Sequence, residues 1–192
     1  MMRLARAITC SSGLLVIPSV MMSQARQPYS IQGSALYTVQ QLSAARSVGG
    51  AGIEVQVRAN PGRFSYGLGL QYSHHESGDE RMDLSGLFFE PRFAIDIGSN
   101  RVTPYVAGRA VLLRQTSEFS SLPKFSSTGN AFGLGGGVLV RLSRRVNADA
   151  GGAFLRQSFS DKSFDNGARV DFAPFNGYVI KAGFTLGLGT RN

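Results

Sequence analysis

The stretch that decides the fold is Gly177-Tyr-Val-Ile-Lys-Ala-Gly-Phe-Thr-Leu-Gly-Leu-Gly189. Every second residue, starting with Tyr178, is apolar, whereas the residues between them are small or polar and include a single charge, Lys181. Successive side chains of a β-strand point to opposite faces, so one face of this segment suits an apolar environment and the other suits a tightly packed one. The pattern predicts a strand of a narrow β-barrel whose apolar face contacts lipid and whose small face lines the lumen.

The composition agrees with an exterior that does not face water. Only 17% of the 192 residues are Asp, Glu, Lys or Arg, whereas a soluble domain carries roughly 25–35% charged residues on its surface. The length predicts a single domain. The formal net charge of +8 favours an anionic lipid surface as partner, and we expect no nucleic acid partner because no basic run has interleaved aromatic residues.

Residues 1–25 have the features of a secretory signal peptide. Arginines form a basic start, an apolar run covers residues 14–22, and residues 23–25 offer a cleavage site between small residues. The apolar run is too short for a helix that spans a bilayer. We therefore expect export and a barrel domain over residues 26–192. That domain contains no cysteine, because Cys10 is the only one in the chain.

Seven further segments alternate in the same way, which gives eight candidate strands. They cover residues 29–41, 51–59, 64–73, 82–97, 103–115, 130–142, 146–157 and 177–189. In the third, aromatic residues lie at both ends and leucines between them, as expected when the ends meet two bilayer interfaces. In the fourth, Pro91 cannot donate to a ladder, and we expect a bulge or register change there. The fifth is ambiguous, because placing Arg109 in the lumen also places Tyr105 and two large apolar residues there.

The connections between these strands alternate in length. Short turns follow the even strands, and longer segments follow the odd ones, over residues 43–50, 74–81, 117–128 and 158–175. This asymmetry is typical of outer-membrane barrels, and it predicts that both termini lie in the periplasm. The first and last strands should then pair, which would leave no free edge.

The two longest connections carry six phenylalanines among serines and charges: Phe119, Phe125, Phe159, Phe164, Phe172 and Phe175. Exposed aromatic residues can mark a binding surface. Alternatively, the hairpins extend beyond the bilayer and pack these rings together. The sequence leaves both interpretations open.

The chain resembles the small eight-stranded outer-membrane β-barrels of the OmpA- and OmpX-like family over essentially its whole mature length. The resemblance implies an all-β, eight-stranded antiparallel up-and-down transmembrane barrel, monomeric, in the bacterial outer membrane, with a structural or surface-interaction role. Its expected partners are lipopolysaccharide, phospholipid and the barrel-insertion machinery. The insertion signal of the family is polar-x-Gly-x-x-apolar-x-apolar, which Lys181, Gly183, Leu186 and Leu188 match. The chain departs from the common form of this signal, because that form ends in an aromatic residue.

Alternation also predicts which charges enter the lumen. Side chains fill the interior of an eight-stranded barrel, so we expect no open pore. Buried charges persist only when they are paired, and we expect the interior charges, which are of both signs, to form a network that braces the barrel. The candidates are Glu54, Arg58, Glu90, Arg92, Asp96, Arg109, Arg141, Asp149 and Lys181. A path for protons or ions is the alternative.

His75 and Ser77, with Glu90 as a later acid, are the candidates for catalysis. A histidine beside a serine and oriented by a carboxylate can generate a nucleophile, and this His-x-Ser pattern is similar to that of outer-membrane lipid A deacylases. The other interpretation is a solvated loop with pH-sensitive histidines. Apart from the adjacent histidines His74 and His75, no residues have the spacing of metal ligands, and no motif indicates a cofactor. The run Gly133-Leu-Gly-Gly-Gly137 lies inside a strand, where it gives room to interior side chains and does not cradle a phosphate.

A secreted lipocalin-like binding barrel is the rival fold, because it also has eight strands and a similar length. Its polarity would be inverted, with apolar residues inside and charges outside. Lipocalins usually carry a tryptophan near the first strand, so the absence of Trp argues against this fold, and so does the low content of charged residues.

Overall fold

The computed structural model describes residues 27–43, 46–78, 80–119, 122–163, 169–170 and 174–189. It contains eight long strands: β1 (Tyr29–Ser43), β2 (Arg46–Ala59), β3 (Phe64–Ser77), β4 (Glu80–Ala94), β5 (Val102–Phe119), β6 (Leu122–Arg141), β7 (Val146–Phe159) and β10 (Phe175–Leu188). Two short strands, β8 (Lys162–Ser163) and β9 (Arg169–Val170), pair separately. The described residues include no helix that is long and apolar enough to cross a membrane. The expected signal peptide lies outside the described residues.

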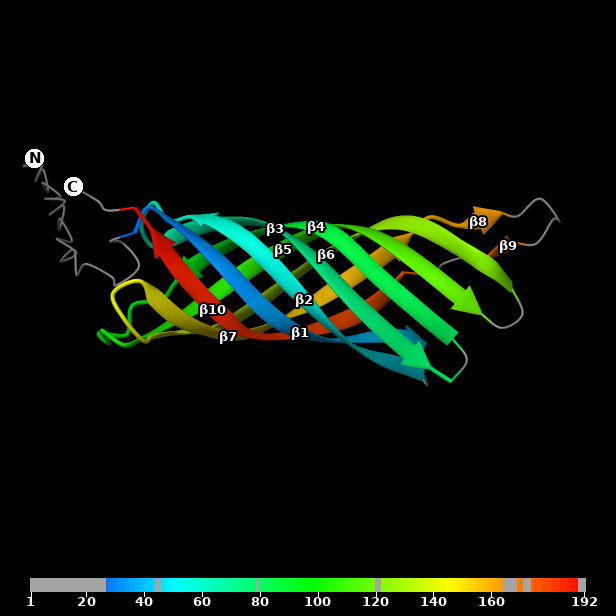
Figure 1. The fold of residues 1–192 in the computed structure, drawn as a ribbon, viewed down its shortest axis with the longest axis horizontal. Helices are drawn as coiled ribbons and strands as arrows, with labels where there is room; N and C mark the ends of the chain where they lie inside the picture. The colour runs from blue at the N-terminus through cyan, green and yellow to red at the C-terminus, as the bar shows by residue number, and fades with distance from the viewer. Residues whose placement is uncertain are drawn as a thin grey trace, which may run out of the picture.

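The eight long strands close into an antiparallel barrel in the order β1-β10-β7-β6-β5-β4-β3-β2 (Figure 1). Long strands that follow one another in the chain are neighbours, and β1 pairs with β10, so that Tyr29 lies opposite Leu188 and Gln41 opposite Asn176. No long strand keeps a free edge. The predicted fold and the predicted pairing of the first and last strands are confirmed.

The two ends of the barrel differ. The turn end holds the start of β1, the end of β10 and the connections 60–63, 95–101 and 142–145. The hairpin end holds the last residues of β1, β3, β5 and β7, the first residues of β2, β4, β6 and β10, and the short strands β8 and β9 (Figure 1).

Three segments expected as loops are mostly strand, namely residues 43–50, 74–81 and 117–128. β3 continues to Ser77, which lies opposite Glu80. The alternation fades in these segments because their outward side chains are polar, but the backbone continues to pair. The loop prediction is therefore wrong for these three connections. The projecting segments nevertheless follow the odd strands, as paired hairpins.

Pro91 causes neither a bulge nor a register change, contrary to expectation. Phe89 lies opposite Ala110 and Arg92 opposite Ala107, so the register between β4 and β5 is the same on both sides of the proline. Pro91, which has no N–H, lies in a two-residue gap of this ladder. The pairs around the gap hold the strands in place.

A belt of apolar side chains encircles the outside of the barrel. Its members are strongly exposed, and Leu134 on β6 reaches 76%. On β3 the belt runs from Phe64 to Tyr72, and the next outward residues are His74 and Glu76. Such a belt is far larger than the apolar patches of soluble proteins. The exterior is that of a barrel embedded in lipid.

The interior holds an apolar layer, a charged layer and further buried polar side chains. Toward the hairpin end lies an apolar layer made of Leu36, Leu84, Phe88, Val111, Leu113, Ala131, Leu155, Phe159 and Val179. Toward the turn end lies the layer of charged side chains, and buried polar side chains such as Gln40, His75 and Gln157 also lie in the hairpin-end half. The fifth strand is no longer ambiguous, because Tyr105 and Arg109 are buried in the lumen while Val106 and Leu112 are exposed outside. Charges inside and apolar residues outside contradict the lipocalin-like alternative.

The phenylalanines at the hairpin end pack together where they are described. Phe125 and Phe159 are buried, and the Phe159 ring stacks on that of Phe175 with centroids 5.8 Å apart. The stacked pair supports the packing interpretation for Phe159 and Phe175, and Phe125 is buried and not exposed as a binding surface would require. Phe164 and Phe172 lie outside the described residues, as does the side chain of Phe119.

Closure of the barrel can be tested with cysteines in a Cys10→Ser background. Ala35 on β1 lies opposite Ala182 on β10, and directly opposed Cα atoms of antiparallel strands, about 4.5–5.5 Å apart, are within disulfide reach. We expect Ala35→Cys/Ala182→Cys to form a disulfide, seen as a reductant-sensitive shift in gel mobility. The control is Ala35→Cys/Ala150→Cys, because Ala150 lies one strand further on, roughly 10 Å away. An equal shift in both pairs would contradict the observed strand order.

Candidate functional site

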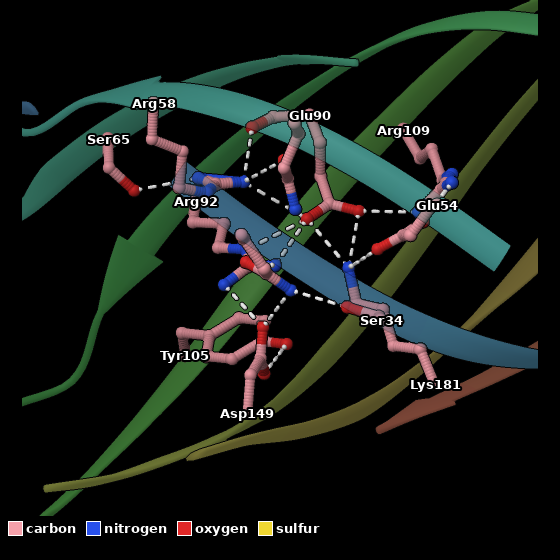
Figure 2. A network of polar contacts seen from close by, with 12 residues as sticks. Ser34, Glu54, Arg58, Ser65, Glu90, Arg92, Tyr105, Arg109, Asp149 and Lys181 are labelled. Atoms are coloured by element: carbon pink, nitrogen blue, oxygen red, sulfur yellow. Dashed lines mark hydrogen bonds and ion pairs between the residues drawn. The ribbon is translucent and has the colours of Figure 1, made fainter. Parts of the chain in front are cut away.

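Glu90 on β4 is the centre of the charged layer (Figure 2). Its Oε1 lies 3.0 Å from Arg58 Nη2 and 2.8 Å from Arg92 Nε. Its Oε2 accepts from Arg109 Nη1 at 2.8 Å, and both oxygens lie 2.9 Å from Lys181 Nζ. One carboxylate that is 2% exposed therefore faces four cations.

Two further carboxylates, Glu54 and Asp149, belong to the charged layer. Glu54 Oε2 accepts from Arg109 Nη2 at 2.6 Å. Asp149 Oδ2 lies 2.9 Å from Arg92 Nη1, and its Oδ1 accepts from the Tyr105 hydroxyl at 2.8 Å. Three buried carboxylates face four buried cations, so the layer carries one excess positive charge if all groups are ionised. Each of these groups has a partner of opposite charge, as burial requires.

Of the nine predicted lumen charges, seven meet in this layer: Glu54, Arg58, Glu90, Arg92, Arg109, Asp149 and Lys181. Asp96 and Arg141 do not, and for these two the prediction is wrong. Asp96 lies beyond the end of β4 and pairs with Arg63 at the turn end, at 3.6 Å. Arg141 is the last residue of β6, and its Nε donates to the carbonyl of Ser143. Alternation predicts which face of a strand a residue lies on but not its position along the barrel axis. Asp96 and Arg141 lie too close to the turn end to reach the charged layer.

Sequence reasoning did not assign roles to the neutral partners of the network. Gln32 donates to Asp149 Oδ2 at 2.6 Å and accepts from Arg92 at 3.1 Å. Gln71 accepts from Arg109 at 2.7 Å. Arg109 also lies over the Phe88 ring, 4.0 Å from its centroid, where the charged layer meets the apolar one. The sequence could have indicated these neutral partners, because alternation places their side chains on the inward faces of the strands.

The glycines on β6 and β7 make room for Tyr105. Gly137 lies opposite Gly151, and a Cβ at either position would be 2.6 Å from the Tyr105 hydroxyl. A larger residue would displace this hydroxyl from Asp149. Gly133, Gly135 and Gly137 lie inside β6. A Cβ at Gly137 would meet the Tyr105 hydroxyl and one at Gly133 would meet the buried Leu155 side chain, which agrees with the interpretation as space for interior side chains at these two positions.

The three catalytic candidates do not meet. His75 lies in the lumen near the hairpin end, where its Nε2 is 2.7 Å from the Thr38 hydroxyl. Ser77 lies opposite Glu80, and the ten residues from Glu80 to Glu90 rise about 33 Å along β4. Glu90 is occupied by the network. The predicted loop around the histidines is in fact the end of β3.

His74 forms a polar cluster on the outside, beyond the edge of the belt. Its Nδ1 is 2.7 Å from Asp83 Oδ1, which also accepts from the Tyr72 hydroxyl, and its Nε2 is 3.2 Å from Glu76. The hydrogen bond with Asp83, and then that with Glu76, raises the pKa of His74. The pKa of Asp83 is lowered, first by its hydrogen bond with His74. In contrast, burial lowers the pKa of His75.

No group of His, Cys, Asp and Glu within the described residues is arranged to hold a metal ion. The lumen carboxylates described above are instead engaged by arginine, lysine or tyrosine side chains, and His75 by a threonine hydroxyl.

Comparison with known proteins places this geometry among solved barrels. Neisserial surface protein A superposes with a TM-score of 0.69 at 15% identity, covering 84% of this chain and 97% of that one. Ail, the attachment invasion locus protein of Yersinia pestis, gives 0.54 at 12% identity, covering 84% and 99%. Outer membrane protein H of P. aeruginosa gives 0.53 at 16% identity, covering 83% and 99%. The fold is that of the small outer-membrane β-barrels. No model of a protein family and no curated sequence matches this chain.

Removal of the central carboxylate should destabilise this barrel strongly. In Glu90→Gln four buried cations lose their shared anion, and breaking buried ion pairs in this way costs about 3–5 kcal/mol. We expect the free energy of unfolding, from urea titration in detergent, to fall by that amount. The matched control is Glu76→Gln, which removes an exposed carboxylate of β3 at a cost of about 1 kcal/mol or less. Equal effects would show that the network does not brace the barrel.

The cluster around His74 should make stability depend on pH. The pKa of His74 is raised in the folded state, so its contribution is complete below the unfolded pKa of about 6.5 and is lost as pH rises through the folded value. The lowered pKa of Asp83 gives a contribution that is present above about pH 3.9 and is lost in stronger acid. We expect His74→Gln to lower urea resistance more at about pH 5.5 than at about pH 8.5. In an Asp83→Asn background this difference should shrink, and a difference of the opposite sign would contradict the assignment.

Proposed function

We propose that this protein is an outer-membrane barrel with a closed lumen, whose role is structural or in surface interaction and not catalytic. The observation that supports the proposal most directly is the filled interior. Arg58, Glu90, Arg92 and Lys181 occupy the turn-end half. The apolar layer around Phe88 fills the other half together with buried polar side chains such as His75 and Gln157. Water and ions would have to displace paired charges and then cross apolar side chains.

The hairpin end is the surface through which the protein would act. Beyond the belt, the paired hairpins β1–β2, β3–β4 and β5–β6 continue with polar outward side chains such as His74 and Glu76. The stack of Phe159 on Phe175 and the burial of Phe125 help to fix the shape of this end. In this proposal the hairpin end faces the exterior of the cell and the turn end faces the periplasm.

The belt defines the lipid partners of the proposed barrel. Phospholipid and lipopolysaccharide would contact the outward residues of β10, among them Leu186 and Leu188, which are exposed. Lys181 and Gly183 of the same strand point inward. The two faces of β10 thus carry the two halves of the predicted insertion signal. Recognition by the insertion machinery and the monomeric state stay predictions.

A deacylase-like activity finds no support in the site. A nucleophile, its base and an orienting acid must lie within hydrogen-bond reach of one another. His75 is bonded to Thr38, and Glu90 lies far along the lumen from Ser77. The arrangement favours a scaffold over an enzyme.

The closed lumen predicts the electrical behaviour of the protein. After reconstitution in planar bilayers, we expect the wild type to give no steady channel. Phe88→Ala should raise the frequency of brief openings, because it removes the ring on which Arg109 rests and leaves a cavity between the two layers. Leu134→Ala, a change of similar kind on the lipid face, is the control. Steady ohmic currents from the wild type would contradict the proposal.

A further inference from the structure

The turn end of the barrel carries a surplus of positive charge. Its described charged residues are the carboxylate Asp96 and the arginines Arg63, Arg101, Arg141, Arg144 and Arg145. Asp96 is engaged by Arg63. Among the described residues no carboxylate pairs with the other four arginines. The potential at this end therefore favours an anion.

Three of these arginines share one pocket at the mouth of the lumen. The residues that matter here are Arg141, Arg144, Arg145, Asn60, Asn147 and Thr185. No carboxylate lines the pocket. The wall formed by the turn is fixed, because the Ser143 hydroxyl accepts from the backbone N–H of Arg145 and of Val146. Gly187 N–H donates to the Arg145 carbonyl at 2.7 Å, which holds the turn against β10.

Thr185 on β10 gives an independent indication of a ligand. Its side chain is 4% exposed, and its Oγ1 has no hydrogen-bond partner. Buried hydroxyl groups are almost always paired. This unpaired hydroxyl lines a pocket that it shares with three arginines and Asn147. The Asn60 amide nitrogen, also at this pocket, already donates to the Gln27 carbonyl and the Ser30 hydroxyl. A ligand that accepts hydrogen bonds would give this hydroxyl the partner that it lacks.

We propose that this pocket binds a phosphate group. Guanidinium forks match the oxygens of phosphate, and three arginines with a hydroxyl supply donors on more sides than the two oxygens of a carboxylate require. The apolar belt ends beside the pocket at Leu142 and Leu188. The pocket thus opens at the depth where the headgroup phosphates of the surrounding lipid lie. A phospholipid headgroup and free phosphate share the chemistry that the pocket recognises.

The test uses the full chain refolded in a detergent without phosphate, titrated in a calorimeter with inorganic phosphate or with short-chain phosphatidylglycerol in mixed micelles. We expect saturable binding of at least one of the two, and the one that binds identifies the source. Thr185→Val should weaken binding roughly tenfold, since it removes one donor to a charged acceptor. Its resistance to urea should be unchanged or increased, because no unpaired hydroxyl remains, and this separates loss of binding from loss of fold.

The arginines are tested by a pair of matched double variants. Arg144→Gln/Arg145→Gln should abolish measurable binding. Arg63→Gln/Arg101→Gln removes the same charge from the same end but leaves the pocket residues in place, and it should retain binding within about threefold. Absence of saturation with both probes would overturn the proposal. Equal losses in the two double variants would also overturn it, because they would assign the effect to overall charge.

Discussion

The structure depends on the pairing of four buried cations with three carboxylates, Glu90 at their centre, in a space from which water is largely excluded. The outside of the barrel lies against lipid, where a neighbouring chain gains little by covering apolar surface. The contacts that hold the wall together are therefore the backbone ladders and the side chains inside. Glu90 joins β2, β4, β5 and β10 through Arg58, Arg92, Arg109 and Lys181. Asp149 extends the same network to β7 through Arg92.

The two interior layers depend on each other. The apolar layer around Phe88 limits access of water from the hairpin end, which strengthens the ion pairs beneath it because the local dielectric is lower. Arg109 links the layers, since its guanidinium contacts the Phe88 ring and both Glu54 and Glu90. Paired charges alone would leave gaps, and apolar residues alone would leave the barrel without directional contacts. Together the two layers fill the lumen and also supply directional contacts between the strands.

Sequence alternation was sufficient for the strands, their faces and the closing pair, because a two-residue period reports directly which side chains meet lipid. It was sufficient for Tyr105 once Arg109 was assigned to the lumen. It failed where a face alone does not decide the outcome. Asp96 and Arg141 have inward parity but lie too near the turn end to reach Glu90. His75 and Ser77 lie on the same face of β3, but both lie far from Glu90 along the barrel axis. The hairpin extensions were missed because polar strands outside the lipid have no apolar period, although their backbones pair.

The pairing of β1 with β10 also sets the order in which the chain can fold. Tyr29 meets Leu188, so the final ladder joins segments separated by most of the chain, and closing a loop of that length costs roughly 4–5 kcal/mol of chain entropy. The other seven ladders each join segments that are consecutive among the long strands, and each can form with a much shorter closure. Until β10 arrives, both β1 and β7 present open edges. A chain that is interrupted during synthesis before residue 175 would lack β10, so β1 and β7 would keep unpaired edges. Such edges can pair with other chains, and we expect the truncated chain to aggregate during assembly.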